Sequence, residues 1–146
     1  NIWKLVPGYD EEGNIDKSKL NRWFKESIKI AKENDRLAVA LISIGHVFYY
    51  AKEDKDGFWI DRNIAEILNK NDYEEIRRGY STKAFNALGV INVDKEGTAW
   101  LKQEEKWRKR ADLCQMEYFR FANTLRELAN TFLEHAEYEK KHYNDF

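Results

Sequence analysis

The sequence predicts an all-α protein of 146 residues. Apolar residues recur at spacings of three and four through most of the chain, which is the period of an α-helix buried on one face. Proline occurs once, at Pro7, so no later segment contains a residue that must break a helix. A chain of this length, 42% hydrophobic and 35% charged, is typical of a globular domain with a real core. We therefore expect a single helical domain over residues 1–146, with five to six helices.

The chain opens with an extended entry segment over residues 1–15. Pro7 and the acidic stretch 10–13 are turn signals in this segment. Asp16 is a favourable N-cap for a first helix over residues 17–33. The apolar face of that helix consists of Leu20, Trp23, Phe24, Ile28 and Ala31.

A second helix is expected over residues 36–51, with Asn34 and Asp35 as its N-terminal cap. It is apolar almost all round, which indicates a buried central helix surrounded by others. Its apolar run, 37–51, is the longest in the chain, yet a membrane-spanning helix needs about 20 apolar residues. The run therefore predicts a core helix and no membrane partner.

The middle of the chain predicts a cluster of short helices. A third helix covers about 60–70, and Asp72 with Glu75 forms a capping box for a short fourth helix. Gly79 separates the fourth helix from a fifth, about 80–88, because glycine is a poor helix former.

A connection then leads into the last helical stretch. Gly89 is the expected C-cap of the fifth helix. Residues 90–93 are extended or form a short strand, and residues 94–97 turn the chain. Thr98 is the expected cap of the helix that follows.

The last stretch reaches Tyr143 without a helix breaker and carries a heptad seam. One helix of this length would span about 69 Å, whereas a globule of this size has a radius of gyration of only about 15 Å. The unbroken phase of the seam favours one long C-terminal helix, bent near Tyr118, but a bent helical hairpin stays open. The seam consists of Trp107, Ala111, Cys114, Tyr118, Phe121, Leu125, Leu128, Phe132 and His135.

The histidines do not predict a metal site. His46 lies in the second helix and is expected in the core. His135 and His142 are seven residues apart with Glu139 between them, but paired ligands on a helix normally lie four apart. We therefore interpret His135 as a packed seam residue and His142 as an exposed residue that favours a helix C-terminus. The acidic turn 54–57 lacks the carboxylates that an EF-hand needs at its first and twelfth positions.

Catalysis has little support in the sequence. Cys114 lies in the middle of the seam, where a thiol behaves as a small buried hydrophobe. Neither a glycine-rich phosphate loop nor a Gly-x-Ser-x-Gly motif is present. We expect no catalytic residue, no cofactor, no metal and hence no enzyme. A single cysteine also suits the reducing cytoplasm.

Two features leave nucleic-acid binding open, although a net charge of −1 does not favour it. One is the basic cluster 106–110, in which Trp107 would stack on a base, and which we interpret as a solvated helix face. The other is segment 61–101, which can form a winged helix-turn-helix with the fifth helix reading the bases. The contacts would then be Arg77, Arg78, Ser81, Lys83 and Asn86.

Short motifs also follow one another in a particular order along nearly the whole chain. They comprise Pro7, 13–16, Leu20, Trp23, Arg36, Ile44, Ala51, 56–59, Gly79, Asn86, Gly89, Gly97, Trp107, Ala111, Tyr118, Arg120, Ala122, Leu125, Leu128, Phe132 and Ala136. In this order the chain resembles the C-terminal helical region of a family of large bacterial proteins of uncharacterised function. The resemblance implies an accessory module of a larger cytoplasmic protein and no known activity. The family tends to have proline where this chain has Phe119, which bears on the break in the last helix.

We therefore expect a non-enzymatic helical C-terminal module, a fragment of a larger protein, that acts in protein–protein interaction or self-association. Its partner would be another domain of the parent protein, a separate protein, or a second copy in a homodimer. The interaction seam would present Trp107, Tyr118, Phe121, Leu125 and Phe132. The alternative is nucleic-acid binding through segment 61–101.

Overall fold

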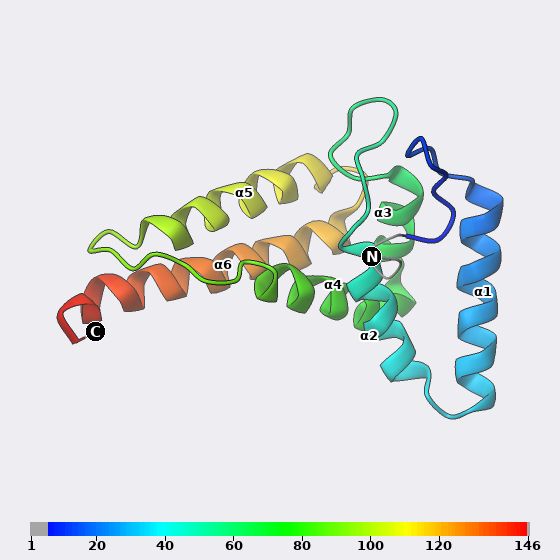
Figure 1. The fold of residues 1–146 in the computed structure, drawn as a ribbon, viewed down its shortest axis with the longest axis horizontal. Coiled ribbons are helices and arrows are strands. Elements are labelled where there is room, and N and C mark those ends of the chain that lie inside the picture. Colours follow the sequence, from blue (N-terminus) through cyan, green and yellow to red (C-terminus); the bar gives the residue numbers. More distant parts are fainter. Residues whose placement is uncertain (1–5, 146) are drawn as a thin grey trace. The chain divides into compact units, whose positions relative to one another are not determined.

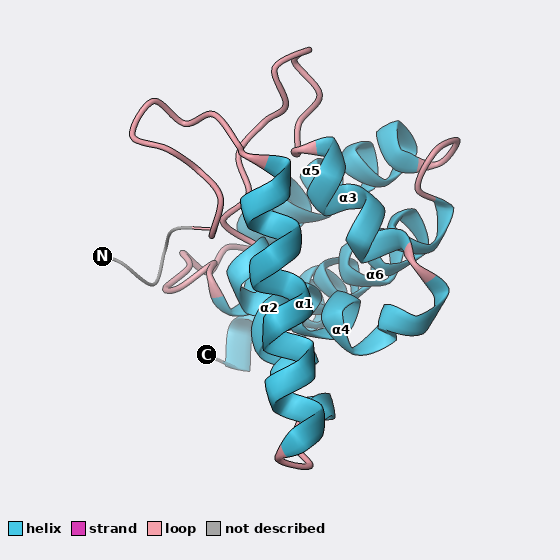
Figure 2. Cartoon of the chain, turned by 90° about the vertical axis from the view of Figure 1, so that its right-hand side faces the viewer, coloured by secondary structure: helices cyan, strands magenta, loops and turns pink. Residues whose placement is uncertain are grey.

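The computed structural model describes residues 6–145 and confirms the all-α prediction (Figure 1). This part of the chain contains six α-helices and two short 3-10 helices. Figure 2 shows helices joined by loops, with no strand in the described residues beyond one isolated bridge. We predicted a single domain, and the chain divides into two compact units, Asn1–Lys83 and Ala84–Phe146. Each unit is described by itself below.

The first unit begins with the entry segment, of which residues 1–5 lie outside the described residues. The rest is not simply extended, because two turns fold it back on itself. The turns place Gly8 and Gly13 at φ values of 105° and 83°, which only glycine adopts readily. An antiparallel bridge joins Tyr9 to Ile15 between them. The segment is therefore a closed loop that delivers Asp16 to the start of the first helix.

Helix α1 (Lys17–Glu33) has the predicted bounds. The carboxylate of Asp16 accepts a hydrogen bond from the backbone N–H of Lys19 at 3.1 Å and caps the helix. Helix α2 (Leu37–Phe48) packs beside α1 after a turn in which Asp35 has a positive φ of 52° (Figure 1). The two helices thus form an antiparallel hairpin.

The prediction that α2 is buried holds for one side of the helix. Leu41, Ile44, Gly45 and Phe48 are buried. Val39 near the N-terminus of α2 is 62% exposed. A helix that is apolar on all sides gives no indication of which side is exposed to solvent. In α2 the exposed part lies near the first turn.

Helix α4 (Glu74–Asn86) replaces the predicted fourth and fifth helices, so the expected break at Gly79 is wrong. A Cβ atom on Gly79 would lie 2.0 Å from the carbonyl oxygen of Ile42 in α2. A Cβ atom on Gly45 in α2 would lie 2.1 Å from the carbonyl oxygen of Ile76 in α4. The backbones of α2 and α4 therefore lie so close together at these two positions that only glycine, whose side chain is a hydrogen atom, fits there.

Helix α3 (Arg62–Asn69) ends against α4 through a buried arginine. The Nη1 atom of Arg77 donates to the carbonyl oxygens of Leu68 at 2.9 Å and Lys70 at 2.6 Å. The last carbonyls of a helix lack helical donors, so the guanidinium bonds the end of α3. The carbonyl of Lys70 also accepts from the backbone N–H of Tyr73 at 3.1 Å. A 3-10 helix (Asn71–Tyr73) stands where a capping box was expected and leads directly into α4.

The second unit is dominated by a hairpin of α5 (Thr98–Cys114) and α6 (Phe119–His142), which pack along each other (Figure 1). A 3-10 helix (Tyr143–Asp145) ends the described chain. Our preference for one long bent helix is therefore wrong, and the bent hairpin is correct. The break comes just before Phe119, where Tyr118 adopts φ −133° and ψ 58°.

The seam explains why the chain folds back. All its residues except His135 are buried, with Trp107 and Cys114 on α5 and Phe121, Leu125 and Phe132 among those on α6. One extended helix would leave this stripe in water, whereas a hairpin buries both halves at once. The turn after Cys114 keeps the spacing of the stripe, so phase alone does not distinguish the two arrangements.

A polar connection fixes the start of α5. The N-cap is Gly97, at φ 66°, and not Thr98 as expected. The carboxylate of Asp94 accepts hydrogen bonds from the backbone N–H groups of Thr98 at 2.9 Å and Glu96 at 3.1 Å. These bonds, that from Thr98 above all, lower the pKa of Asp94. Residues 90–93 form no strand.

Glu139 on α6 ties this connection to the hairpin. Its carboxylate is buried and accepts from the backbone N–H of Asp94 and from Nε1 of Trp100, both at 3.1 Å.

Replacing Glu139 with leucine leaves both donors without an acceptor, and we expect the free energy of unfolding to fall by about 2 kcal/mol. Chemical denaturation measures the change. Glu137→Leu, on the exposed side of the same helix, is the matched control and should stay within about 0.5 kcal/mol. Equal effects of the two substitutions would contradict this role.

Candidate functional site

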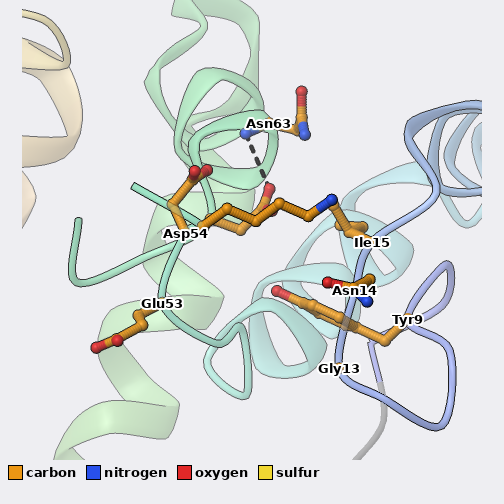
Figure 3. Close-up of a pocket in the computed structure, with 9 residues that line it drawn as sticks. Tyr9, Gly13, Asn14, Ile15, Glu53, Asp54 and Asn63 are labelled. Carbon is orange, nitrogen blue, oxygen red and sulfur yellow. Dashed lines mark hydrogen bonds between the residues drawn. The ribbon is translucent and has the colours of Figure 1, made fainter. Parts of the chain in front are cut away.

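A polar cavity in the first unit lies between the entry loop and the connection that precedes α3 (Figure 3). Its volume is about 200 Å³. Tyr9, Asn14 and Ile15 line it from the entry loop, and Asp54 and Asn63 line it from the other side. The Oη atom of Tyr9 accepts a hydrogen bond from the backbone N–H of Lys52 at 3.1 Å, which joins the two walls.

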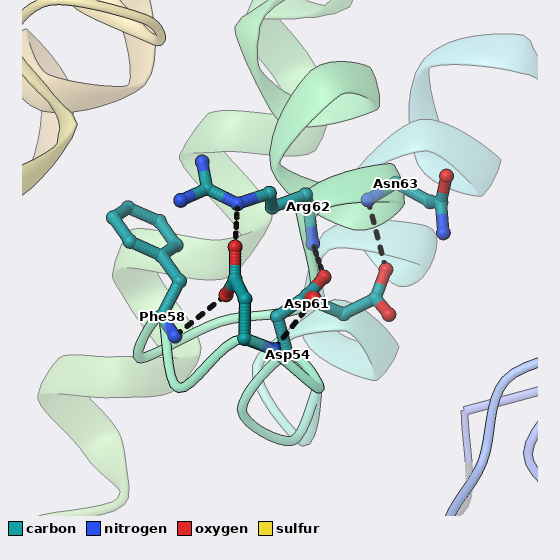
Figure 4. Close-up of polar contacts among 6 residues, drawn as sticks. Asp54, Phe58, Asp61, Arg62 and Asn63 are labelled. Carbon is teal, nitrogen blue, oxygen red and sulfur yellow. Dashed lines mark hydrogen bonds and ion pairs between the residues drawn. The ribbon is translucent and has the colours of Figure 1, made fainter.

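The carboxylates near this cavity are engaged in holding their own loop (Figure 4). Asp54 accepts from the backbone N–H of Arg62 at 2.9 Å. Asp56 accepts from the backbone N–H of Phe58 at 2.9 Å and from Nε of Arg62 at 2.8 Å. Asp61 caps α3 by accepting from the backbone N–H groups of Asn63 and Ile64. The loop is therefore a rigid connection built from aspartate turns, as predicted for 54–57.

The same contacts set the charges of this region. Burial raises the pKa of Tyr9 to about 12, and the charges of Asp61 and Asp54 add to the effect. Burial also raises the pKa of Asp61, opposed by the hydrogen bonds from Ile64 and Asn63. The hydrogen bond from the backbone of Phe58, followed by that from Arg62, lowers the pKa of Asp56.

This arrangement favours a structural role for the cavity. Ligand pockets usually enclose roughly 300–1,000 Å³ and are mostly apolar, whereas this one is smaller and polar. The described residues contain no group of three or more His, Cys, Asp or Glu placed to hold a metal ion. Both acidic segments contain turns, at residues 11–13 and 55–57.

Asp61 gives a pH-dependent prediction. Because burial raises its pKa in the fold, the folded state keeps a proton that the unfolded chain has already lost, and stability decreases as pH rises through this window. Asp61→Asn retains an oxygen that caps α3 but does not titrate. We expect the stability of the variant relative to the wild type to increase between about pH 3 and about pH 7. Urea denaturation at both pH values measures it, and a constant or decreasing difference would contradict the assignment.

The predicted interaction seam lies inside the chain. Trp107 is 1% exposed and Tyr118 is 5% exposed, and Phe121, Leu125 and Phe132 are fully buried. A partner could reach these side chains only if the α5–α6 hairpin opened. An exposed interaction surface must therefore be sought elsewhere.

The structure does not assemble the predicted nucleic-acid contacts into a recognition helix. Arg77 is buried and bonded to the end of α3, which does not fit the expected phosphate contact. The Nζ atom of Lys83 lies 5.6 Å from the centre of the Tyr50 ring. Arg78 and Asn86 are exposed and Ser81 is half-buried, all on the continuous helix α4. The fifth helix and the wing that this interpretation needs do not form in the described residues.

The basic cluster 106–110 is engaged as well. Trp107 is buried and does not offer its ring to a base, so the stacking interpretation is wrong. The cations of Lys106 and Arg110 lie over that ring, 5.2 Å and 4.9 Å from its centre. Burial, and then the charge of Arg110, lower the pKa of Lys106.

The structure places two histidines differently from our expectation. His135 is exposed, whereas we expected it to be packed, and His142 is half-buried, whereas we expected it to be exposed. His135 stacks on Trp100 at 4.6 Å, and His142 lies 3.0 Å from the carboxylate of Asp145. Glu139 is bonded to Trp100, so these three side chains form no ligand set. Cys114 is buried as predicted. His46 is half-buried, more exposed than a core residue.

Two further hollows lie on α1 and at the start of α2, and they are apolar. The first, about 410 Å³, is lined by Lys19, Arg22, Trp23, Glu26, Ser27 and Ile30. The second, about 440 Å³, shares Ser27 and Ile30 and adds Ala31, Asn34, Arg36, Val39 and Ala40. Because they share two residues, they form one continuous surface, which we call the α1–α2 groove.

Sequence reasoning missed this groove, although a signal was present. The residues Lys19, Trp23, Glu26 and Ile30 recur at four, three and four, beside the stripe that α1 buries. Ile30 falls outside the predicted apolar face and is 51% exposed. An isoleucine out of phase with the core stripe of an otherwise charged helix was the available signal.

Comparison with protein-family models, with curated proteins and with solved structures found no match. Within residues 6–145, no helix is both long and apolar enough to cross a membrane.

Proposed function

We propose that this chain is a non-enzymatic helical module that binds another protein through the α1–α2 groove. The observation that carries the proposal is the groove itself, in which Ile30 is 51% exposed and Val39 is 62% exposed. Adjoining apolar hollows rimmed by polar residues are typical of surfaces that proteins use for binding.

The rest of the chain supports this choice of surface. The residues of the heptad seam, except His135, are buried where α5 and α6 pack together. In the polar cavity, Asp54 and Asp61 are bonded to the backbone at the start of α3. In the groove, by contrast, exposed apolar side chains adjoin open volume.

We further propose that the module works in the cytoplasm as an accessory part of a larger bacterial protein. The single cysteine supports a reducing compartment. The order of short motifs along the chain supports the bacterial family.

Selection of peptides against the chain tests the proposed function. A phage library of random peptides is panned on the immobilised protein, and binders are rescreened on Ile30→Asp and Val39→Asp. We expect the selected peptides to bind neither groove variant and to bind Met116→Asp as they bind the wild type. Met116→Asp is the control, because it introduces an aspartate at a residue that is 92% exposed in the second unit. Binders that keep both groove variants, or a selection that yields no binder, would contradict the proposal.

A further inference from the structure

The rim of the α1–α2 groove is basic. Three cations line it, Lys19, Arg22 and Arg36, against one anion, Glu26. All four side chains are exposed, and none of the three cations has an ion-pair partner among the described residues. Helix α1 as a whole carries six Lys or Arg and two Glu, whereas the whole chain has a net charge of −1. Helix α1 is therefore basic, and two of its cations together with Arg36 line the groove.

The floor of the groove has the spacing of a helix-binding surface. Trp23 and Ile30 lie seven residues apart on one stripe of α1, which separates them by about 10 Å. The Trp23 ring is held in place by an edge contact with Phe48, with ring centres 6.2 Å apart. The apolar floor then continues to Val39 at the start of α2. A floor of this length fits two to three turns of a helix with apolar residues at i, i+3, i+4 and i+7.

The charge of the rim selects among the possible occupants. A second copy of this chain would bring the same basic rim against itself in a symmetric dimer, and like charges oppose that pairing. An acidic partner would instead neutralise cations that have no ion-pair partner among residues 6–145. Charge complementarity and the floor therefore agree on one type of ligand.

We propose that the α1–α2 groove binds an acidic amphipathic helix of another protein, with apolar residues on the floor and carboxylates at Arg22 and Arg36. This inference rests on the proposed function and specifies its partner. Apolar contacts with Ile30 and Val39 supply affinity, and the basic rim supplies the preference for acidic sequences.

The test uses three rhodamine-labelled helical peptides and fluorescence anisotropy with the full chain. The first peptide has leucine at i, i+3, i+4 and i+7 and glutamate at the solvent-facing positions. The second has the same composition in scrambled order, and the third replaces every glutamate with lysine. We expect the first peptide to bind at least about tenfold more tightly than either control. Its affinity should fall when ionic strength rises from about 0.05 M to about 0.5 M.

Matched variants locate the binding. The double substitution Arg22→Glu/Arg36→Glu should weaken binding of the acidic peptide by about tenfold or more, and so should Ile30→Asp. Lys17→Glu reverses a single charge on α1 outside the groove and should alter affinity by less than about twofold. All of these positions are exposed, so circular dichroism should show unchanged helicity.

The outcomes separate this inference from the proposed function. If the lysine peptide binds as tightly as the glutamate peptide and Ile30→Asp abolishes both, the groove binds proteins but the acidic preference is wrong. If phosphatidylserine vesicles bind the chain and none of the peptides does, the basic face recognises lipid and the inference is overturned. Loss of the acidic peptide in Arg22→Glu/Arg36→Glu, with retention in Lys17→Glu, supports it.

Discussion

Replacing Gly45 or Gly79 with alanine is expected to lower the free energy of unfolding by at least about 3 kcal/mol. A Cβ atom on Gly45 would lie 2.1 Å from the carbonyl oxygen of Ile76 and 2.6 Å from the backbone nitrogen of Tyr80. On Gly79 it would lie 2.0 Å from the carbonyl oxygen of Ile42. The obstructing atoms are backbone, so no side-chain rotation relieves the overlap and the helices α2 and α4 must separate.

The sign of this effect makes it a sharp test. Helix propensity alone favours alanine over glycine by about 1 kcal/mol, so an unobstructed glycine within a helix should give a more stable alanine variant. Urea denaturation followed by far-UV circular dichroism measures the change. Ser43→Ala, on an exposed position of α2, is the control and should change stability by less than about 0.5 kcal/mol. Stabilisation by Gly45→Ala or Gly79→Ala would show that α2 and α4 do not approach this closely.

The second large effect is expected in the hairpin of α5 and α6. Phe121 and Phe132 are fully buried, and replacing either with alanine should cost about 3–5 kcal/mol through lost burial and the cavity left behind. The same range is expected for Trp107→Ala, because Trp107 is 1% exposed. Chemical denaturation of each variant measures the loss.

Phe119 provides the matched control, because it is also a phenylalanine on α6 and is 47% exposed. Phe119→Ala should cost less than about 1 kcal/mol. A comparable loss of stability in Phe119→Ala and Phe121→Ala would show that the buried face of α6 is assigned incorrectly. The hairpin also predicts that the unfolding midpoint does not depend on protein concentration, whereas a long helix that buried its seam in a dimer would show such a dependence.

The helix pattern was predictable where one face is buried and the ends carry caps. Helix α1 has the predicted bounds because Asp16 is an effective N-cap and the buried stripe repeats with the helical period. Two other expectations failed for physical reasons. Gly79 was interpreted as a helix breaker, but it permits a contact with a helix more than thirty residues earlier in the chain, which no local pattern reveals. The expectation of one continuous last helix was wrong because a short turn can preserve heptad phase.

The functional site depended still more on tertiary structure. From the sequence we predicted that the seam binds a partner and that Arg77 contacts nucleic acid. In the structure the seam residues other than His135 are buried, and Arg77 is buried and bonded to the end of α3. The groove instead combines a stripe of α1 with the first turn of α2, and the exposure of Val39 depends on how these two helices meet. Ile30 alone was visible beforehand as an apolar residue out of phase with the buried face.

Methyl NMR of the chain with the acidic helical peptide shows which of the two surfaces binds. We expect the methyl signals of Ile30 and Val39 to shift on titration, because both side chains lie on the floor of the groove. The signals of Leu125 and Leu128 should stay in place, because they are buried on α6. Shifts confined to Leu125 and Leu128, with Ile30 and Val39 unchanged, would show that partners bind through the seam and would contradict the assignment of the α1–α2 groove.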